Sequence, residues 1–163
     1  MTFISDRNRV QLKDPLIDGR QSETALKIQR GCQRYLRGLD FCSVPEVTLA
    51  SGRRADLLAL GPKSDLWIIE IKSSVADFRA DSKWETYRDF CDRLYFATVA
   101  EVPLDIFPQE AGLILCDSYG AEIIREAPEH KLAAARRKAV TLRFAQCAAR
   151  RLQDISDPDR RLG

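Results

Sequence analysis

Residues 53–72 read RRADLLALGPKSDLWIIEIK and contain two apolar runs, each of which carries an acidic residue. Asp56 lies in the first run, and Glu70 and Lys72 close the second, in the pattern D-x13-E-x-K. A glycine–proline turn separates the runs, so we expect two adjacent strands. Side chains alternate along a strand, which sends Glu70 and Lys72 to one face and Ile71 to the other. The pattern therefore predicts two neighbouring carboxylates beside a lysine.

These side chains are suited to metal-dependent hydrolysis of phosphodiester bonds. Asp56 and Glu70, with the backbone carbonyl of Ile71, would bind Mg2+ or Mn2+ through oxygen. Such a metal generates hydroxide near neutral pH and neutralises phosphate charge, while Lys72 would orient the attacking water or stabilise the phosphate. The bare pattern also arises by chance, and the same residues would then form an ion pair at the end of a strand.

Two further acidic residues are candidates to complete the site. A turn at residues 50–52 joins the first run to a preceding strand, and a three-residue loop with Gly52 in the left-handed conformation would place Glu46 opposite Asp56. A two-residue loop would send Glu46 to the other face. Glu46 is therefore either a third ligand or an exposed strand residue. Glu23 either reaches the site from the first helix or only interacts with the helix dipole.

Apolar periodicity along the rest of the chain predicts a mixed α/β fold with a single domain over residues 1–163. Ser82 and Glu85 form a capping box that opens the second helix, and residues 73–80 are interpreted as a loop. An N-terminal arm is expected at 1–21 and a loose tail at 156–163. The expected helices span 23–37, 83–92 and about 132–152, and the expected strands span 43–49, 53–60, 66–72, 94–99, 112–116 and 121–125.

Two sets of residues are candidates for contacting nucleic acid. Lys83 and Tyr87 lie one helical turn apart and would contact a phosphate together; otherwise they are a solvated lysine over a half-buried ring. Arg136, Arg143 and Arg150 recur every seven residues, which keeps them on one stripe of the last helix. Such a stripe either follows a phosphate backbone or is simply solvated.

The composition is that of a globular protein, with 45% hydrophobic and 31% charged residues and a net charge of +2. The five cysteines show no metal-ligand spacing, and the single histidine, His130, excludes a multi-histidine site. The apolar runs are too short to cross a bilayer, and the first residues do not form a signal peptide. We therefore expect a cytoplasmic protein without a membrane partner.

Residues 23–99 resemble the PD-(D/E)xK nuclease superfamily. The resemblance implies a restriction-endonuclease-like core of a helix, a three-stranded antiparallel meander, a helix and a strand, here with extra strands and a long C-terminal helix. It gives the D-x13-E-x-K residues the metal-binding and catalytic positions, and Glu23 the position of the acid often found on the first helix. Ala55 stands where the superfamily name has proline, which is a tolerated variation.

Longer segments are similar to the MmcB-like DNA repair proteins of bacteria. They include EVTLASGRRADLLAL at 46–60, WIIEIKSSVADFRADSKWETYRDFCDRLYFATV at 67–99, and residues 112–152. This resemblance implies DNA repair, with DNA as the partner, and leaves open whether the protein cuts DNA or only binds it as a non-catalytic or adaptor domain. Because many nucleases of the superfamily act as dimers, a homodimer is also left open.

Overall fold

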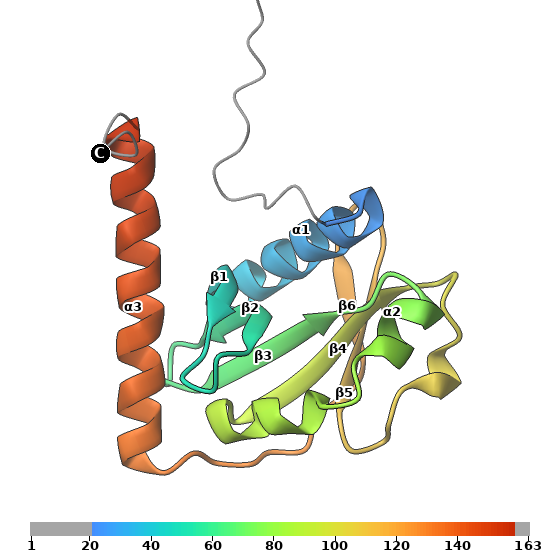
Figure 1. The fold of residues 1–163 in the computed structure, drawn as a ribbon. Helices are drawn as coiled ribbons and strands as arrows, with labels where there is room; N and C mark the ends of the chain where they lie inside the picture. Colours follow the sequence, from blue (N-terminus) through green and yellow to red (C-terminus); the bar gives the residue numbers. More distant parts are fainter. Residues whose placement is uncertain (1–20, 159–163) are drawn as a thin grey trace, which may run out of the picture.

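Six strands form one mixed sheet in the computed structural model, which describes residues 21–158 (Figure 1). The spatial order of the strands follows the chain. The first three are antiparallel, the third to the fifth are parallel, and the sixth is antiparallel to the fifth. The strands are β1 (Cys42–Thr48), β2 (Arg54–Leu60), β3 (Leu66–Ile71), β4 (Arg93–Val99), β5 (Gly112–Cys116) and β6 (Ala121–Arg125).

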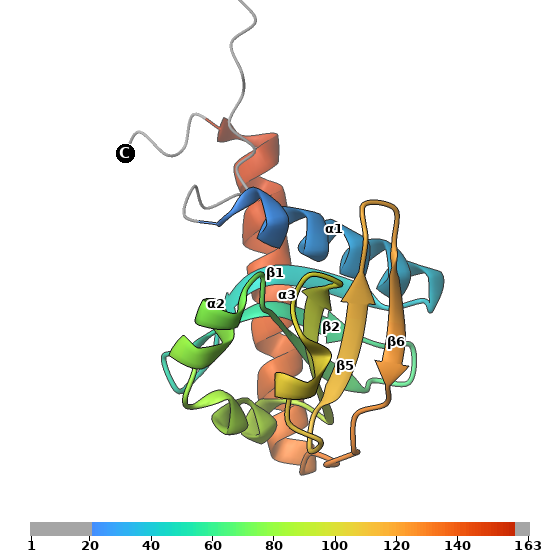
Figure 2. The same ribbon diagram turned by 90° about the vertical axis from the view of Figure 1, so that its right-hand side faces the viewer.

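Helix α1 (Glu23–Gly38) covers one face of the sheet (Figures 1 and 2). It begins where expected, because the Ser22 hydroxyl accepts a hydrogen bond from the Ala25 N–H at 3.1 Å. Ile28, Cys32 and Leu36, which recur at helical spacing, are fully buried against the sheet. The predicted mixed α/β fold and its helix, meander and strand order are confirmed.

The opposite face carries α2 (Val75–Ala80), the 3-10 helices η1 (Trp84–Phe90) and η2 (Leu104–Ile106), and α3 (Ala134–Ser156). The prediction of a loop at 73–80 was wrong, because Ser74 caps α2 by accepting from the Asp77 N–H at 3.1 Å. The helix expected at 83–92 is present as the shorter 3-10 helix η1. The Lys83 carbonyl accepts from the backbone and hydroxyl of Thr86, which favours a 3-10 turn without the predicted capping box.

Helix α3 stands at the edge of the molecule and packs on the body through one side (Figure 1). Val140 and Phe144 are buried, and Arg137 forms two hydrogen bonds of 2.6 Å with the carboxylate of Asp92. The Leu132 N–H also donates to Asp92, which holds the residues before Ala134 outside the helix.

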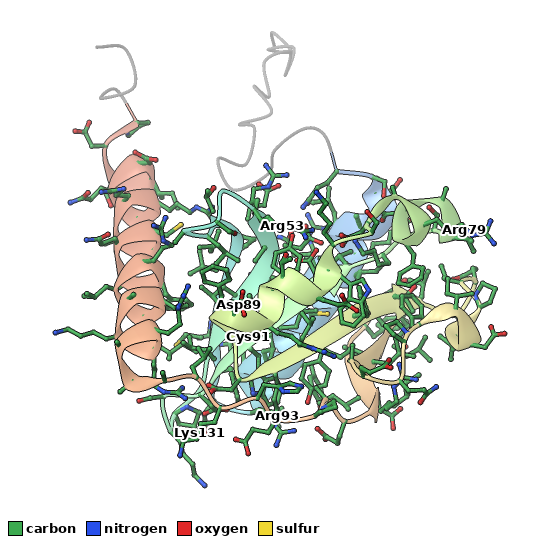
Figure 3. All side chains as sticks on the ribbon, turned by 60° about the horizontal axis from the view of Figure 1, so that its bottom comes forward. Arg53, Arg79, Asp89, Cys91, Arg93 and Lys131 are labelled. Carbon is green, nitrogen blue, oxygen red and sulfur yellow. The ribbon has the colours of Figure 1, made fainter. Side chains whose placement is uncertain are left out.

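The segment that leads into α3 carries Lys131 (Figure 3). The helix begins at Ala134 rather than near 132 and continues to Ser156 rather than 152. It therefore includes the first residue of the expected tail. The arm expected at 1–21 and the tail fall outside the described residues over 1–20 and 159–163. Among the described helices, none is long and apolar enough to span a membrane.

Of the two loop lengths considered for the β1–β2 turn, the structure has the three-residue loop. Gly52 has a φ of +85°, and the Leu49 N–H donates to the Arg53 carbonyl at 2.7 Å. The β1–β2 residue pairs on either side of Glu46 place it opposite Asp56, although Glu46 and Asp56 do not themselves pair in the ladder. Glu46 has a φ of +51°, an unusual value for a non-glycine residue.

The alternation of side chains along β2 breaks at Asp56. Ala55 and Leu58 pack in the same apolar cluster although they are three residues apart, whereas Leu57 packs in the cluster under α1. A regular strand would send Ala55 and Leu58 to opposite faces. The irregularity lies beside Glu46. At the same point, the Asp56 N–H donates to the side chain of Glu70 instead of to a backbone carbonyl of β3.

Candidate functional site

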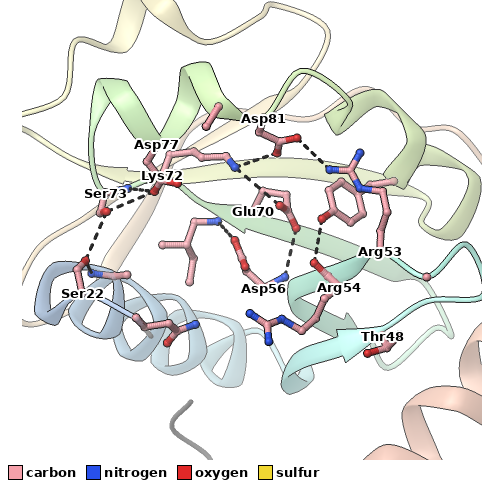
Figure 4. A pocket seen from close by; sticks show the side chains of 16 residues that line it. Ser22, Thr48, Arg53, Arg54, Asp56, Glu70, Lys72, Ser73, Asp77 and Asp81 are labelled. Atoms are coloured by element: carbon pink, nitrogen blue, oxygen red, sulfur yellow. Dashed lines mark hydrogen bonds and ion pairs between the residues drawn. The ribbon is translucent and has the colours of Figure 1, made fainter. Parts of the chain in front are cut away.

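A cleft of about 860 Å³ lies between the start of α1, the β1–β2 hairpin, the end of β3 and α2 (Figure 4). Among the described residues, Asp56, Glu70, Ile71 and Lys72 all line it. The strands thus bring together the residues of the D-x13-E-x-K pattern. Most of the other lining side chains are also polar or charged.

Asp56 and Glu70 are joined by two reciprocal hydrogen bonds (Figure 4). The Asp56 N–H donates to Glu70 Oε1 at 3.2 Å, and the Ile71 N–H donates to Asp56 Oδ2 at 2.8 Å. The β2–β3 ladder ends at Leu57 and Ile69. Just beyond this point, each carboxylate accepts a hydrogen bond from the backbone of the neighbouring strand. This arrangement fixes the two carboxylates side by side.

Both carboxylates are costly to ionise. Burial raises the pKa of Glu70 well above its usual value, and the nearby charge of Asp56 raises it further. Burial also raises the pKa of Asp56, despite its hydrogen bond from Ile71 and the charge of Lys72. Glu70 is only 3% exposed. A buried and a half-buried carboxylate side by side, both with raised pKa values, are typical of a functional site.

Lys72 lies between two acidic groups. Its Nζ is 2.8 Å from Asp81 Oδ2 and 3.9 Å from Glu70 Oε2. Burial acts to lower the pKa of Lys72, but the hydrogen bond to Asp81 and the charges of Glu70 and Asp81 outweigh it and raise the pKa. Because Lys72 is closer to Asp81, its charge offsets only part of the cost of ionising Glu70.

Two residues that the D-x13-E-x-K pattern does not include hold Lys72 in place. Arg53 donates to Asp81 Oδ1 at 2.9 Å, and its guanidinium lies 4.3 Å from the centre of the Tyr87 ring. Burial opposes ionisation of Asp81, but hydrogen bonds from Lys72 and Arg53 lower its pKa overall. One overlooked signal was the capping sequence Ser74-x-x-Asp77, which predicts a helix whose end returns Asp81 to the site.

Glu46 and Glu23 do not line the cleft. The carboxylate of Glu46 lies 3.3 Å from Arg54 and accepts from Gln21 at 3.4 Å. The Glu23 side chain is 85% exposed and pairs with Lys27 at 3.3 Å. Within residues 21–158, no group of three or more His, Cys, Asp or Glu side chains is placed to hold a metal. Neither Glu46 nor Glu23 therefore joins Asp56 and Glu70 in the cleft.

Tyr87 lines the cleft, but Lys83 does not. The Tyr87 side chain is buried, and its hydroxyl donates to the Arg54 carbonyl at 2.9 Å. Lys83 contributes its backbone carbonyl, which accepts from Arg53 and Thr86. The two residues therefore do not present a joint phosphate contact in this structure.

The three arginines predicted on the last helix lie outside the cleft. Arg143 donates to the Thr48 carbonyl at 3.0 Å, and the Arg136 guanidinium lies 5.0 Å from the centre of the Phe90 ring. Both arginines line a separate groove of about 280 Å³ between α3 and the β1–β2 turn. Arg150 is exposed. A common basic surface of these residues stays a prediction.

Comparison with known proteins places the chain in a family. A model of the DNA repair protein MmcB-like family matches residues 12–159. The chain belongs to the MmcB-like family of DNA repair proteins. A solved structure, that of the SPO1766 protein of unknown function from Silicibacter pomeroyi, is 48% identical, with a TM-score of 0.82. The match covers 85% of this chain and 95% of that one. No curated protein matched.

Proposed function

We propose that this protein is a Mg2+- or Mn2+-dependent nuclease that hydrolyses phosphodiester bonds of DNA during repair. The observation that carries the proposal is the convergence of Asp56, Glu70 and Lys72 in one cleft. Membership of a DNA repair family supports DNA as the substrate. The superfamily resemblance implies the same reaction for these three residues.

The cleft fits a small divalent cation. Burial disfavours the charged forms of Asp56 and Glu70, and the charge of Asp56 adds to this effect at Glu70, so a cation beside them would offset both effects. Mg2+ binds proteins through one or two carboxylates and keeps several waters, so the pair is a sufficient donor set, with Ile71 lining the same cleft. When bound, the metal would supply Lewis acidity and an activated water.

The remaining residues would position the substrate. Lys72 is held charged in the cleft by Asp81, so its ammonium group would stabilise the developing charge of a phosphate. Arg53 keeps Asp81 in place from the β1–β2 turn. Asp81 is therefore a positioning residue, which acts through Lys72.

The test is cleavage of single-stranded, duplex and branched DNA by the purified protein with Mg2+, Mn2+ or chelator. Asp56→Asn, Glu70→Gln and Lys72→Met should each reduce cleavage by about 100-fold or more. Glu23→Gln and Glu46→Gln are matched controls, because they neutralise acids outside the cleft, and should retain activity. Cleavage that persists in Asp56→Asn or Lys72→Met would reject the assignment.

Metal binding can be measured separately. Titration calorimetry with Mn2+ should show a site in the wild type that is lost in Glu70→Gln and retained in Glu23→Gln. A wild type that neither binds Mn2+ nor cleaves any of these substrates would contradict the proposal of a nuclease.

The second candidate is a DNA-binding protein that does not cut. It is favoured by the finding that, within residues 21–158, no group of three or more His, Cys, Asp or Glu side chains is placed to hold a metal; Asp81, another acid of the cleft, is bound by Lys72 and Arg53. It predicts salt-sensitive DNA binding that survives Glu70→Gln and weakens when Arg136, Arg143 and Arg150 are replaced by glutamine. Binding that is unchanged by the arginine substitutions would argue against this candidate.

A further inference from the structure

The side of α3 that faces away from the body carries exposed apolar residues between Leu142 and Leu152, with the exposed Lys138 and Arg150 near them. Val140 and Phe144, on the inner side, are 3% and 7% exposed, whereas Leu142 and Leu152 on the outer side are 53% and 64% exposed. The outward face of a surface helix normally carries charged residues. Here the outward face also carries leucine.

Four residues form what we call the outer stripe of α3: Leu142, Ala145, Ala149 and Leu152. All four are exposed, and they are spaced by three, four and three residues, as in the seam of a coiled coil. The exposed neighbours of the stripe include the uncharged Gln146 and Gln153. An uncharged seam of this kind is typical of a surface that packs against another helix.

Two of the arginines near the stripe are directed elsewhere. Arg143 donates to the Thr48 carbonyl at 3.0 Å, and Arg151 donates to the carbonyls of Pro45 and Glu46. A phosphate backbone is held by cationic side chains, which the outer stripe does not supply. The stripe is therefore suited to an apolar protein partner rather than to DNA.

We propose that the outer stripe binds the outer stripe of a second copy of this chain in an antiparallel pair. The pattern L-x2-A-x3-A-x2-L reads the same in both directions. A two-fold axis beside residue 147 would set Leu142 of one copy against Leu152 of the other, and Ala145 against Ala149. The same contacts would then form with the two copies exchanged. This reciprocity is what a two-fold symmetric interface requires. The small alanines at its centre allow two helices to approach closely.

Charge favours the antiparallel arrangement over a parallel one. In the same register, Lys138 near the start of one helix faces Ser156 and Asp157 at the end of the other. A parallel pair would set Lys138 against its own copy. Antiparallel helices also align the positive end of each helix dipole with the negative end of the other.

The position of α3 leaves the surface accessible. Figures 1 and 2 show the helix standing at the edge of the molecule, and no other element of residues 21–158 covers its outer side. None of the four stripe residues lines the cleft. The proposal therefore goes beyond the proposed nuclease activity and holds whether or not the protein cuts DNA.

Sedimentation equilibrium of the full chain, from about 1 µM to 1 mM, tests the pair. We expect a reversible dimer whose dissociation constant rises about 100-fold or more in Ala145→Glu and in Ala149→Glu, because each places two like charges in an apolar seam. Ala134→Glu is the matched control, since it adds the same charge to an exposed position of the same helix outside the stripe. Circular dichroism checks that all three variants fold.

A wild type that stays monomeric throughout this range overturns the proposal, as does a dimer that all three variants weaken equally. The orientation is tested with Ala145→Cys and Ala149→Cys, each in a background where the exposed Cys42 is serine. Mixed under mild oxidation, the two variants should form a disulfide-linked heterodimer. Efficient linkage of Ala145→Cys to itself would overturn the antiparallel register.

Discussion

Asp81 binds the ammonium group of Lys72 at 2.8 Å, across nine positions of sequence that include all of α2. Lys72 is 5% exposed, so this contact supplies the hydrogen bond that a buried ammonium group requires. The contact keeps Lys72 charged and aimed into the cleft. The residue that follows α2 is therefore as much a part of the site as the residues of β3.

Asp81→Asn should weaken both the fold and the proposed reaction. The amide cannot balance the charge of Lys72, so we expect the free energy of unfolding to fall by about 2 kcal/mol. DNA cleavage should fall by about tenfold or more, in kcat rather than KM. Urea denaturation and steady-state kinetics measure the two effects. Asp89→Asn, at an exposed position of η1, is the control, and equal stability of the two variants would contradict the pairing.

Glu70→Gln should stabilise the protein at neutral pH while abolishing its proposed function. The pKa of Glu70 is raised in the folded state, so the folded protein holds this proton more tightly than the unfolded chain. Stability is therefore lost as pH rises from the unfolded pKa to the folded pKa. Glutamine keeps the shape without the charge, which we expect to add about 1 kcal/mol at pH 7.

Urea denaturation of the wild type and Glu70→Gln from about pH 4 to pH 8 measures this difference. The gain of the variant should grow with pH, and it should shrink when Mn2+ is added, because the metal stabilises only the wild type. Glu85→Gln, at an exposed position, should show no gain. A gain that is the same at every pH would contradict the buried charge as its cause.

Gly52→Ala should destabilise the β1–β2 turn and displace Arg53. Gly52 has a φ of +85°, a conformation that costs a residue with a Cβ about 1 kcal/mol. Gly38→Ala is the matched control, because a Cβ there meets no atom within 4 Å and the φ of Gly38 is not positive. Thermal denaturation should show a loss for Gly52→Ala and no loss for Gly38→Ala. Equal melting temperatures of both variants would argue that the turn is not strained by a side chain.

Arg137→Ala should loosen the attachment of α3. It leaves the carboxylate of Asp92, which is 2% exposed, without its cation, and we expect a loss of about 3 kcal/mol at pH 7. Burial opposes ionisation of Asp92, but its hydrogen bonds from Arg137 and two backbone N–H groups lower its pKa. In the wild type this stability is present above the unfolded pKa of an aspartate and is lost as pH falls through the folded pKa.

Urea denaturation at pH 7 and below pH 4 checks this prediction. The variant should lose less stability on acidification than the wild type, because most of the contribution is already gone. Arg150→Ala removes an exposed arginine from the same helix and should leave the stability unchanged. A loss in Arg137→Ala that persists undiminished in acid would contradict the ion pair.

Local sequence patterns predicted the parts of the site that lie on adjacent strands. The period of two put Glu70 and Lys72 on one face of β3, and the apolar run around Asp56 identified β2. The sequence left the length of the β1–β2 turn open, although Gly52 suits the left-handed position of the three-residue loop. These features depend on neighbouring residues, whose geometry the backbone fixes.

The structure alone decided which other charged groups join the site. Glu46 lies opposite Asp56, yet its carboxylate is bound by Arg54 rather than directed into the cleft. Asp81 enters because α2 and the Arg53 contact return it to Lys72.

The sequence by itself thus determined the fold class, the acidic pair and its lysine, and membership of a recognisable family. Tertiary structure decided the partner of Lys72 and the exposed outer stripe of α3. A charged side chain has several possible partners at similar separations along the chain. Burial and packing determine which of these partners it contacts, and neither is set by local sequence.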